Sequence, residues 1–353
     1  MRLKTNSETL VIKRTIFIAL LGLSGLPQAQ AITLPSGSCG VSGDCLTFGD
    51  FNVYSLAYLN TVAGLGKPVS GDPYYVGSSP RQISDGVVIG TGSTGSLVNQ
   101  NFPGMDDAFA TPNSANGEVT FSTTTAGDPG TLGVPGLFGT ADQTTSWDAN
   151  ISDMRSFLAT GGGGFTPFFN LNETGTDGLT GIDLQIWVHM WVDNAAGDKQ
   201  DFYLWGNPLE FGGNGTNTTS AIGPSTNSPN DLDPQWATVN GTICIDGSTV
   251  LHFGSCVGTD PSTARNVDQN LGANSAAFAI YNAELDNIIK TSNLYTGLHI
   301  DWRMIHENNG FEQAFLLTDT VPPPPPPPPA PEPFTLALLG LGLLGMSRKL
   351  LVR

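Results

Sequence analysis

Histidine and acidic side chains fall in two stretches of this chain where polar and apolar residues alternate. The first stretch carries Asp183, His189, Asp193 and Glu210, and the second carries His299, Asp301 and His306. Such groups can act as general acid and base in hydrolysis if the fold brings two of them together. Half-exposed strands show the same alternation without any chemistry, and the motifs Gly-x-Ser-x-Gly and His-Glu-x-x-His are absent. We therefore expect a protein that is not an enzyme.

Aromatic residues are interleaved with these polar positions. Four of them lie close together in the sequence: Trp187, Trp191, Tyr203 and Trp205. Flat rings can cover the apolar side of a sugar while neighbouring amides and carboxylates bind its hydroxyl groups. These four residues are therefore a candidate polysaccharide-binding face. The alternative is that a second sheet, or a helix containing Trp147, covers the face, and we favour this packing role.

The aromatic positions depend on a strand predicted over residues 181–193. Even-numbered residues from Ile182 to Val192 are all apolar, whereas odd-numbered ones from Asp183 to Asp193 are polar or aromatic. In a strand these two sets lie on opposite faces. A second strand over residues 201–205 follows a short polar turn, which predicts a hairpin with a shared aromatic face.

Further segments predict short helices and strands. One helix is indicated by apolar residues at helical spacing, namely Trp147, Ile151, Met154 and Leu158. Ser146 would cap its start and Gly161 lies past its end. Phe278, Tyr281, Leu285 and Ile288 suit a second short helix, with a strand over residues 276–280 as the alternative.

Turn residues mark two more hairpins and an edge. Asp246 and Gly247 predict a hairpin over residues 243–257, and Asn309 with Gly310 predicts another over residues 298–317. Pro167 suggests that residues 165–171 form an edge strand. The expected fold is mostly β, an antiparallel β-sandwich or jelly-roll with one or two short helices.

The charge balance excludes two classes of partner. The chain has 353 residues, and between residues 32 and 321 seven cations stand against 29 carboxylates, a net charge of −22. A surface this negative repels nucleic acid and anionic lipid. We expect neither as a partner.

Four cysteines indicate an oxidising compartment. Cys39 lies near Cys45, and Cys244 lies near Cys256, so two local disulfides are the simplest of three pairings. Zinc sites favour tighter Cys-x-x-Cys or Cys/His spacing. Asp/Asn clusters at residues 193–198 and 227–233 do not match an EF-hand loop and are adequately explained as turns. We expect no metal and no cofactor.

The N-terminus has the features of an export signal. Four cations precede an apolar stretch over residues 15–26, and small residues follow at Ala29 and Ala31. This order predicts a secretory signal peptide, cut after Ala31, that directs the chain through the Sec translocon.

The C-terminus has three consecutive segments of distinct physical character. Eight prolines, residues 322–329, favour a semi-rigid polyproline II spacer. The apolar residues 334–346 are fewer than the roughly twenty that span a bilayer, although flanking cations can extend their reach by snorkelling. Those cations are Arg348, Lys349 and Arg353. Positive charge beside a membrane segment stays on the cytoplasmic side, which places the body outside.

The order Pro331, Glu332, Pro333, then "TLALLGLGLLG" over residues 335–345, then a basic end, resembles the PEP-CTERM sorting signal of Gram-negative bacteria that make extracellular polysaccharide. The resemblance implies processing at or near Glu332 by exosortase, an integral-membrane cysteine transpeptidase. It also implies transient anchoring in the inner membrane. The alternative is an ordinary C-terminal membrane anchor, which does not require the Pro-Glu-Pro motif.

The sequence therefore predicts four parts: a signal peptide (1–31), an extracellular β-rich domain (32–320), a proline-rich linker (321–330) and a sorting signal (331–353). We expect a secreted or cell-surface protein with a structural or adhesive role, in an extracellular matrix or envelope. A polysaccharide-binding module is the alternative, and a glycan-active hydrolase is the third hypothesis.

Overall fold

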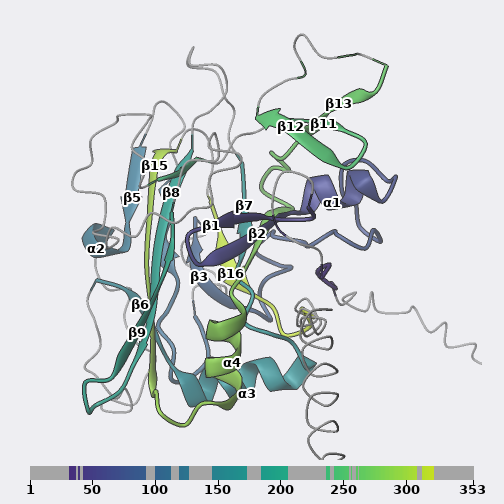
Figure 1. Ribbon diagram of the computed structural model, residues 1–353. Coiled ribbons are helices and arrows are strands. Elements are labelled where there is room, and N and C mark those ends of the chain that lie inside the picture. The colour runs from purple at the N-terminus through teal and green to yellow at the C-terminus, as the bar shows by residue number, and fades with distance from the viewer. Residues whose placement is uncertain are drawn as a thin grey trace, which may run out of the picture.

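The computed structural model describes residues 32–36, 39, 43–92, 100–112, 119–126, 145–172, 184–205, 236–238, 242–253, 256, 260, 262–307 and 312–321. These segments form three β-sheets and four helices, arranged as Figure 1 shows. The mostly β, mainly antiparallel fold predicted from the sequence is confirmed. The predicted signal peptide with Ala29 and Ala31, and the C-terminal segment from residue 322 onward, lie outside the described residues. That segment includes Pro331, Glu332, Pro333, Arg348, Lys349 and Arg353.

The first sheet has the strand order β1-β2-β14-β7-β16-β3-β4. Its strands are β1 (Leu46–Phe48), β2 (Phe51–Ser55), β14 (Ala276–Tyr281), β7 (Phe168–Asn170), β16 (Ala314–Leu316), β3 (Val87–Thr91) and β4 (Phe109–Ala110). All neighbours are antiparallel except β3 and β4. β14 and β3 are buried along their whole length, so this sheet is covered on both faces.

The second sheet is built around two long strands, β8 and β15, which pair antiparallel. Its strands are β10 (Ala237–Thr238), β8 (Gln185–Asp193), β9 (Lys199–Leu204), β15 (Gly297–Glu307), β5 (Val119–Ser122) and β6 (Trp147–Asn150). β9 and β10 pair with different parts of β8, and β5 and β6 pair with different parts of β15. A third, small sheet contains β12 (Thr249–Phe253), β11 (Thr242–Asp246) and β13 (Ala264–Asp268).

The two larger sheets share one hydrophobic core. Its members come from the inward faces of both, including Ile186, Val188 and Met190 of β8 and Phe278 and Ile280 of β14. Ring contacts cross the space between the sheets, since Trp302 of β15 packs edge-on against Phe169 of β7, with ring centroids 5.7 Å apart. A second cluster on the other face of the first sheet includes Tyr54, Leu56 and Phe315.

Four helices close the ends and flanks of this arrangement: α1 (Leu56–Val62), α2 (Thr123–Ala126), α3 (Ile151–Gly161) and α4 (Ala283–Thr291). α3 and α4 lie together at one end of the molecule, at the bottom of Figure 1. Arg155 of α3 joins them by donating to the carbonyl oxygens of Ile289 and Ser292 at 2.8 and 2.6 Å.

The predicted helix at residue 147 begins four residues later than expected. Trp147 to Asn150 form β6, which pairs with β15, and α3 starts only at Ile151. The helical part of the pattern is correct, since Ile151, Met154 and Leu158 are buried in the core. For residues 276–288 both alternatives occur, because β14 leads directly into α4.

Two strand predictions are wrong because they depend on non-local pairing. β15 and β16 do not form a hairpin: β15 pairs within the second sheet and β16 within the first. β7 is not an edge strand, because it lies between β14 and β16. Pro167 is tolerated since it precedes β7 and its carbonyl accepts from the Ile280 amide at 2.9 Å.

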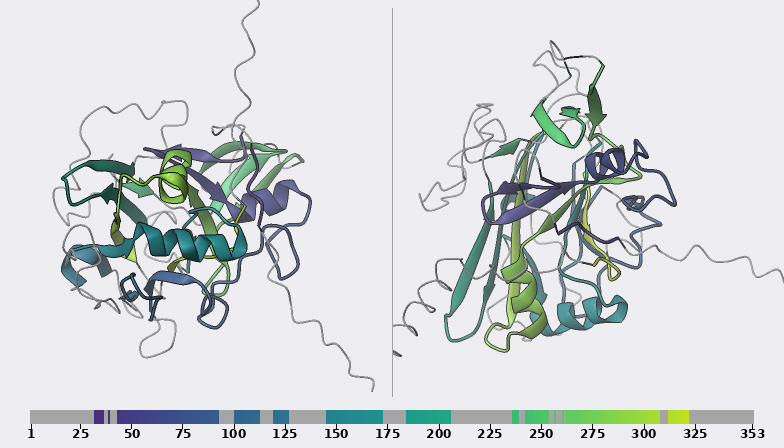
Figure 2. Two further views of the ribbon diagram at one scale, coloured as in Figure 1. Left: turned by 90° about the horizontal axis from the view of Figure 1, so that it is seen from below. Right: turned by 45° about the vertical axis from the view of Figure 1, so that its right-hand side comes forward.

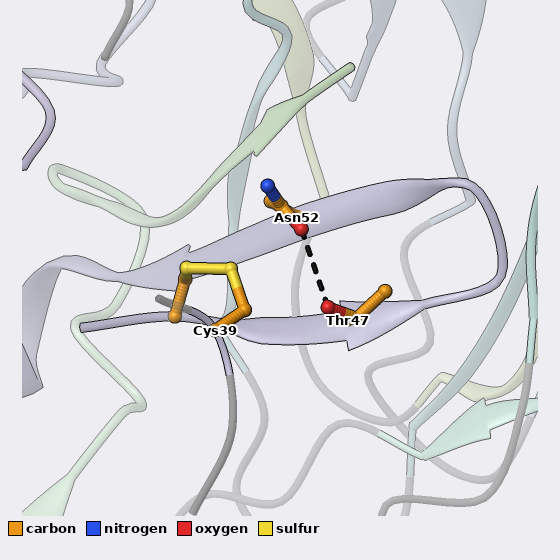
Figure 3. Close-up of a disulfide and its surroundings, with 4 residues drawn as sticks. Cys39, Thr47 and Asn52 are labelled. Atoms are coloured by element: carbon orange, nitrogen blue, oxygen red, sulfur yellow. Dashed lines mark hydrogen bonds between the residues drawn. A yellow bond between two sulfur atoms is a disulfide. The ribbon is translucent and has the colours of Figure 1, made fainter. Parts of the chain in front are cut away.

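The two disulfides have the pairings favoured from the sequence. Cys39 is bridged to Cys45, and Cys244 to Cys256. The first bridge ties the N-terminal segment to the start of β1, beside a hydrogen bond from the Thr47 hydroxyl to the Asn52 side chain, as Figure 3 shows. The second ties the β11–β12 hairpin to the segment that follows it.

The two ends of the described domain meet. The Val321 amide donates to the Ile32 carbonyl at 2.8 Å, and the Leu34 amide donates to the Val321 carbonyl at 3.2 Å. Ile32 and Leu34 are buried. Within the described part of the chain, no helix has the length and hydrophobicity needed to cross a membrane.

A substitution at Gly90 tests the close packing of β3 against Trp302 of β15. A methyl group at this position of β3 would lie 2.2 Å from the Trp302 ring. We expect Gly90→Ala to lower the free energy of unfolding by about 1–3 kcal/mol, the usual effect of overpacking a core. Urea unfolding would measure this loss. In a Trp302→Phe background the loss should shrink, because the smaller ring leaves room, and an equal loss in both backgrounds would contradict the contact.

Candidate functional site

The strand pair β8–β9, drawn in teal at the left of the right-hand view of Figure 2, carries the predicted aromatic residues. These residues lie on the outer side of the second sheet, away from the core. Ile186, Val188, Met190 and Val192 of β8 point into the core, which sends the intervening residues to the opposite face. These residues of β8, together with their neighbours on the same side of the sheet, are called the aromatic face. It comprises Trp187, His189, Trp191, Tyr203, Trp205 and His299. The predicted strands and their hairpin are confirmed.

Four rings of the aromatic face stack on one another in a row across the sheet. Tyr203 of β9 stacks on His189 of β8 at 4.3 Å between centroids and an angle of 6°. His189 stacks on Trp191 at 4.6 Å, and Trp191 stacks on His299 of β15 at 4.9 Å and 14°. Ring faces that a sugar would need are thus turned toward neighbouring rings.

The remaining two aromatic residues also pack against protein. Trp187 is only 2 % exposed and lies in a small cluster with Trp236 and Ile305. Trp205 lies against Gly49 in the β1–β2 turn, where a side chain would clash with the indole. Trp191, Tyr203 and Trp205 keep part of their surface exposed.

Within the part of the chain that the structure describes, neither a second sheet nor α3 lies over the row of stacked rings. Two cations lie over the indoles: the Lys199 ammonium is 4.9 Å from the Trp191 ring, and the Arg303 guanidinium is 4.7 Å from the Trp187 ring. Such contacts favour a cation over an aromatic face. Among the described residues, these cations and the ring stacking cover part of the face and leave Trp191, Tyr203 and Trp205 partly exposed.

Each of these cations is paired with a carboxylate. Asp201 contacts both His189 and Lys199 at 2.7 Å, and Asp301 contacts Arg303 at 2.6 Å. Burial tends to raise the pKa of Asp201, but the hydrogen bonds and charges of Lys199 and His189 outweigh it, so this pKa is lowered. The pKa of His189 is lowered, because burial outweighs the attraction of Asp201.

His299 lies between two carboxylates at the inner end of the ring row. Its Nδ1 is 2.7 Å from Asp148 of β6, and its Nε2 is 3.2 Å from Asp193 of β8. The side chains of His299 and Asp148 are fully buried. Burial opposes protonation of the ring, but the hydrogen bonds and charges of Asp148 and Asp193 outweigh burial and raise the pKa of His299.

The His299 ring and the Asp148 carboxylate are buried and are engaged with other side chains. The ring nitrogens of His299 are hydrogen-bonded to Asp148 and Asp193. The Ser146 hydroxyl also donates to Asp148, at 2.7 Å. The arrangement instead joins β6, β8 and β15 through a buried ion pair. Gly297 is required beside it, because a methyl group there would lie 2.7 Å from both His299 and Asp193.

The structure brings some of the predicted acid–base residues together, and others lie outside the described residues. His299 and Asp193 meet, and Asp301 accepts instead from the Thr123 hydroxyl at 2.8 Å. Asp183, Glu210 and the side chain of His306 lie outside the described residues. Asp148 was missed, since the helical spacing around Trp147 concealed a strand that faces His299 directly.

The acidic cluster at residues 193–198 is a hydrogen-bonded turn. The Asn194 side chain accepts from the amides of Ala196 and Asp198 at 2.9 and 3.1 Å. The cluster at residues 227–233 lies outside the described residues. Among the residues that are described, no group of three or more His, Cys, Asp or Glu side chains is arranged to hold a metal ion.

Comparison with known protein families assigns most of the chain to one family. A family model described as a domain of unknown function, DUF8239, matches residues 32–303, and the chain belongs to this family. Neither the curated proteins nor the solved structures include a match.

The buried histidine predicts a pH dependence of stability. Because the folded protein raises the pKa of His299, its ion-pair stabilisation is complete below the unfolded pKa of about 6.5 and is lost as the pH rises through the raised value. We expect His299→Gln to cost about 3–5 kcal/mol near pH 6, since it leaves buried carboxylates without a cation. The cost should shrink toward pH 9.

Urea unfolding at several pH values would measure this trend. His189→Gln is the matched control, because burial lowers the pKa of His189 and gives its contribution the opposite dependence on pH. Equal pH slopes for the wild type and His299→Gln would contradict the buried ion pair.

Proposed function

We propose that this chain is an exported, exosortase-sorted protein of the cell surface or extracellular matrix of a Gram-negative bacterium, with a structural or adhesive role. The observation that carries the proposal is the C-terminal order of Pro331-Glu332-Pro333, an apolar strip and a basic end. The apolar strip would hold the precursor in the membrane while the motif lies at the outer face, within reach of a membrane enzyme.

The disulfides support export. Both bridges join cysteines close in sequence, and all four cysteines are paired. Disulfides of this structural kind persist in oxidising environments outside the cytoplasm. The bridged domain therefore fits an extracellular location.

The meeting of the two domain ends supports a precursor held at both of them. Ile32 immediately follows the proposed cleavage site, and Val321 immediately precedes the proline run. The hydrogen bonds between these residues bring both ends to one place. A domain anchored by a signal peptide and by a C-terminal helix could thus fold without either anchor straining it.

The packing of the domain supports a non-enzymatic role. The acid–base group nearest to a catalytic arrangement, His299 with its two aspartates, is buried and engaged in structural hydrogen bonds. We infer that the two larger sheets form a β-sandwich extended by the small third sheet, a common platform for surface display.

The sorting proposal predicts a processed C-terminus. We expect the intact mass of the mature protein to show cleavage after Ala31 and near Glu332. In cells that lack exosortase, the C-terminal cleavage should disappear and the protein should remain with the inner membrane. Pro331→Ala with Pro333→Ala should reproduce that result, whereas Pro324→Ala in the linker is the matched control. Extracellular protein that retains residues beyond Met346 would contradict the proposal.

Polysaccharide binding is the second candidate, favoured by the partial exposure of Trp191, Tyr203 and Trp205 beside Lys199 and Asp201. If the aromatic face binds glycan, Trp191→Ala should weaken retention on the producing organism's polysaccharide by tenfold or more, about 1.4 kcal/mol. Trp187→Phe is the control, because Trp187 is buried. Equal retention of both variants, or none by the wild type, would exclude binding at this face.

A further inference from the structure

The three sheets meet around an apolar cavity of about 70 Å³. We propose that this cavity binds the end of an uncharged aliphatic chain. The site is separate from the aromatic face and does not depend on the sorting proposal.

The lining of the cavity is mostly hydrocarbon. The first sheet contributes Val53, Phe169, Phe278 and Ile280, the second contributes Ile186, Leu204 and Ala237, and the third contributes Ile243. Most of these side chains are less than a tenth exposed and belong to the core. These core side chains would therefore shield an apolar ligand from water wherever they contact it.

The size of the cavity argues against a simple packing defect. Protein interiors leave few voids larger than a water molecule, whose share of liquid volume is roughly 30 Å³. Water needs two to four polar partners to occupy such a space, and apolar cavities without them stay dry and take up apolar molecules. The lining offers mainly hydrocarbon contacts, and its polar residues are Asp44, Ser55, Tyr58 and the buried Gln269.

The cavity reaches the surface along β1. Gly43, Asp44, Leu46 and Phe48 line it and are partly exposed. The Cys39–Cys45 disulfide and the Thr47–Asn52 hydrogen bond hold this rim in place, as drawn in Figure 3. A chain could enter here with its end inside and its remainder outside.

The polar groups at the rim select against an anionic ligand. The Ser55 hydroxyl accepts from the Tyr58 amide, and the Tyr58 hydroxyl donates to the Ser248 carbonyl, so both are engaged. Burial raises the pKa of the Tyr58 hydroxyl, and the negative charge of the nearby Asp44 carboxylate raises it further. A carboxylate ligand would meet the charge of Asp44 and the net charge of the body, whereas an alcohol would not.

Binding of 1-hexanol and hexanoate to the purified protein tests the proposal. Chemical-shift titration should show saturable binding of 1-hexanol, and hexanoate should bind at least tenfold more weakly. Ala237→Leu fills the cavity from within and Val53→Phe narrows it near the rim, so each should weaken 1-hexanol binding at least tenfold. Ala195→Leu, at an exposed position in the β8–β9 turn, is the matched control.

Thermal unfolding distinguishes filling from damage. A cavity-filling Ala237→Leu variant should keep or raise its melting temperature while it loses binding, and if this variant fails to fold, Val53→Phe carries the test. Absence of saturable 1-hexanol binding by the wild type would overturn the proposal, as would unchanged binding by the folded variants. Binding of hexanoate equal to that of 1-hexanol would overturn the assignment of an uncharged ligand.

Discussion

The structure depends on the packing of two sheets across one hydrophobic core, and Trp302 shows how this constraint acts. Its ring, 2 % exposed, contacts Phe121 within its own sheet and Phe169 across the core, and it occupies the space left by Gly90. Because side chains alternate along a strand, sending Trp302 inward sends His299, Asp301 and Arg303 outward. The polar outer face of β15 is therefore a consequence of its apolar inner face.

On the outer face of the second sheet, aromatic and charged side chains are stabilised by contacts with one another. Lys199 and Arg303 each lie over an indole and pair with an aspartate, while His299 is held between two more. Stacking, cation–π contacts and ion pairs together satisfy groups that could otherwise be mistaken for a catalytic or binding site.

Local patterns predicted the parts of the fold that depend on neighbouring residues. The alternation from Gln185 to Asp193 and the turn before Lys199 were sufficient for β8, β9 and their hairpin. The helical spacing from Ile151 to Leu158 was sufficient for α3. The same spacing wrongly included Trp147, which lies in β6 and pairs with Ile300 of β15. The Asn309-Gly310 turn signal could not reveal that β15 and β16 belong to different sheets.

The sequence by itself determined the alternating faces of β8 and the acidic net charge of the chain, and it favoured the pairing of cysteines close in the chain. The order of the C-terminal segments in the sequence also carries the sorting proposal. Only the tertiary structure decided that Asp148 and Asp193 enclose His299, that Ile32 meets Val321, and that three sheets leave an apolar cavity between them. The physical reason is that these features join residues more than a hundred positions apart, so their contacts depend on which strands pair, and no local periodicity encodes that choice.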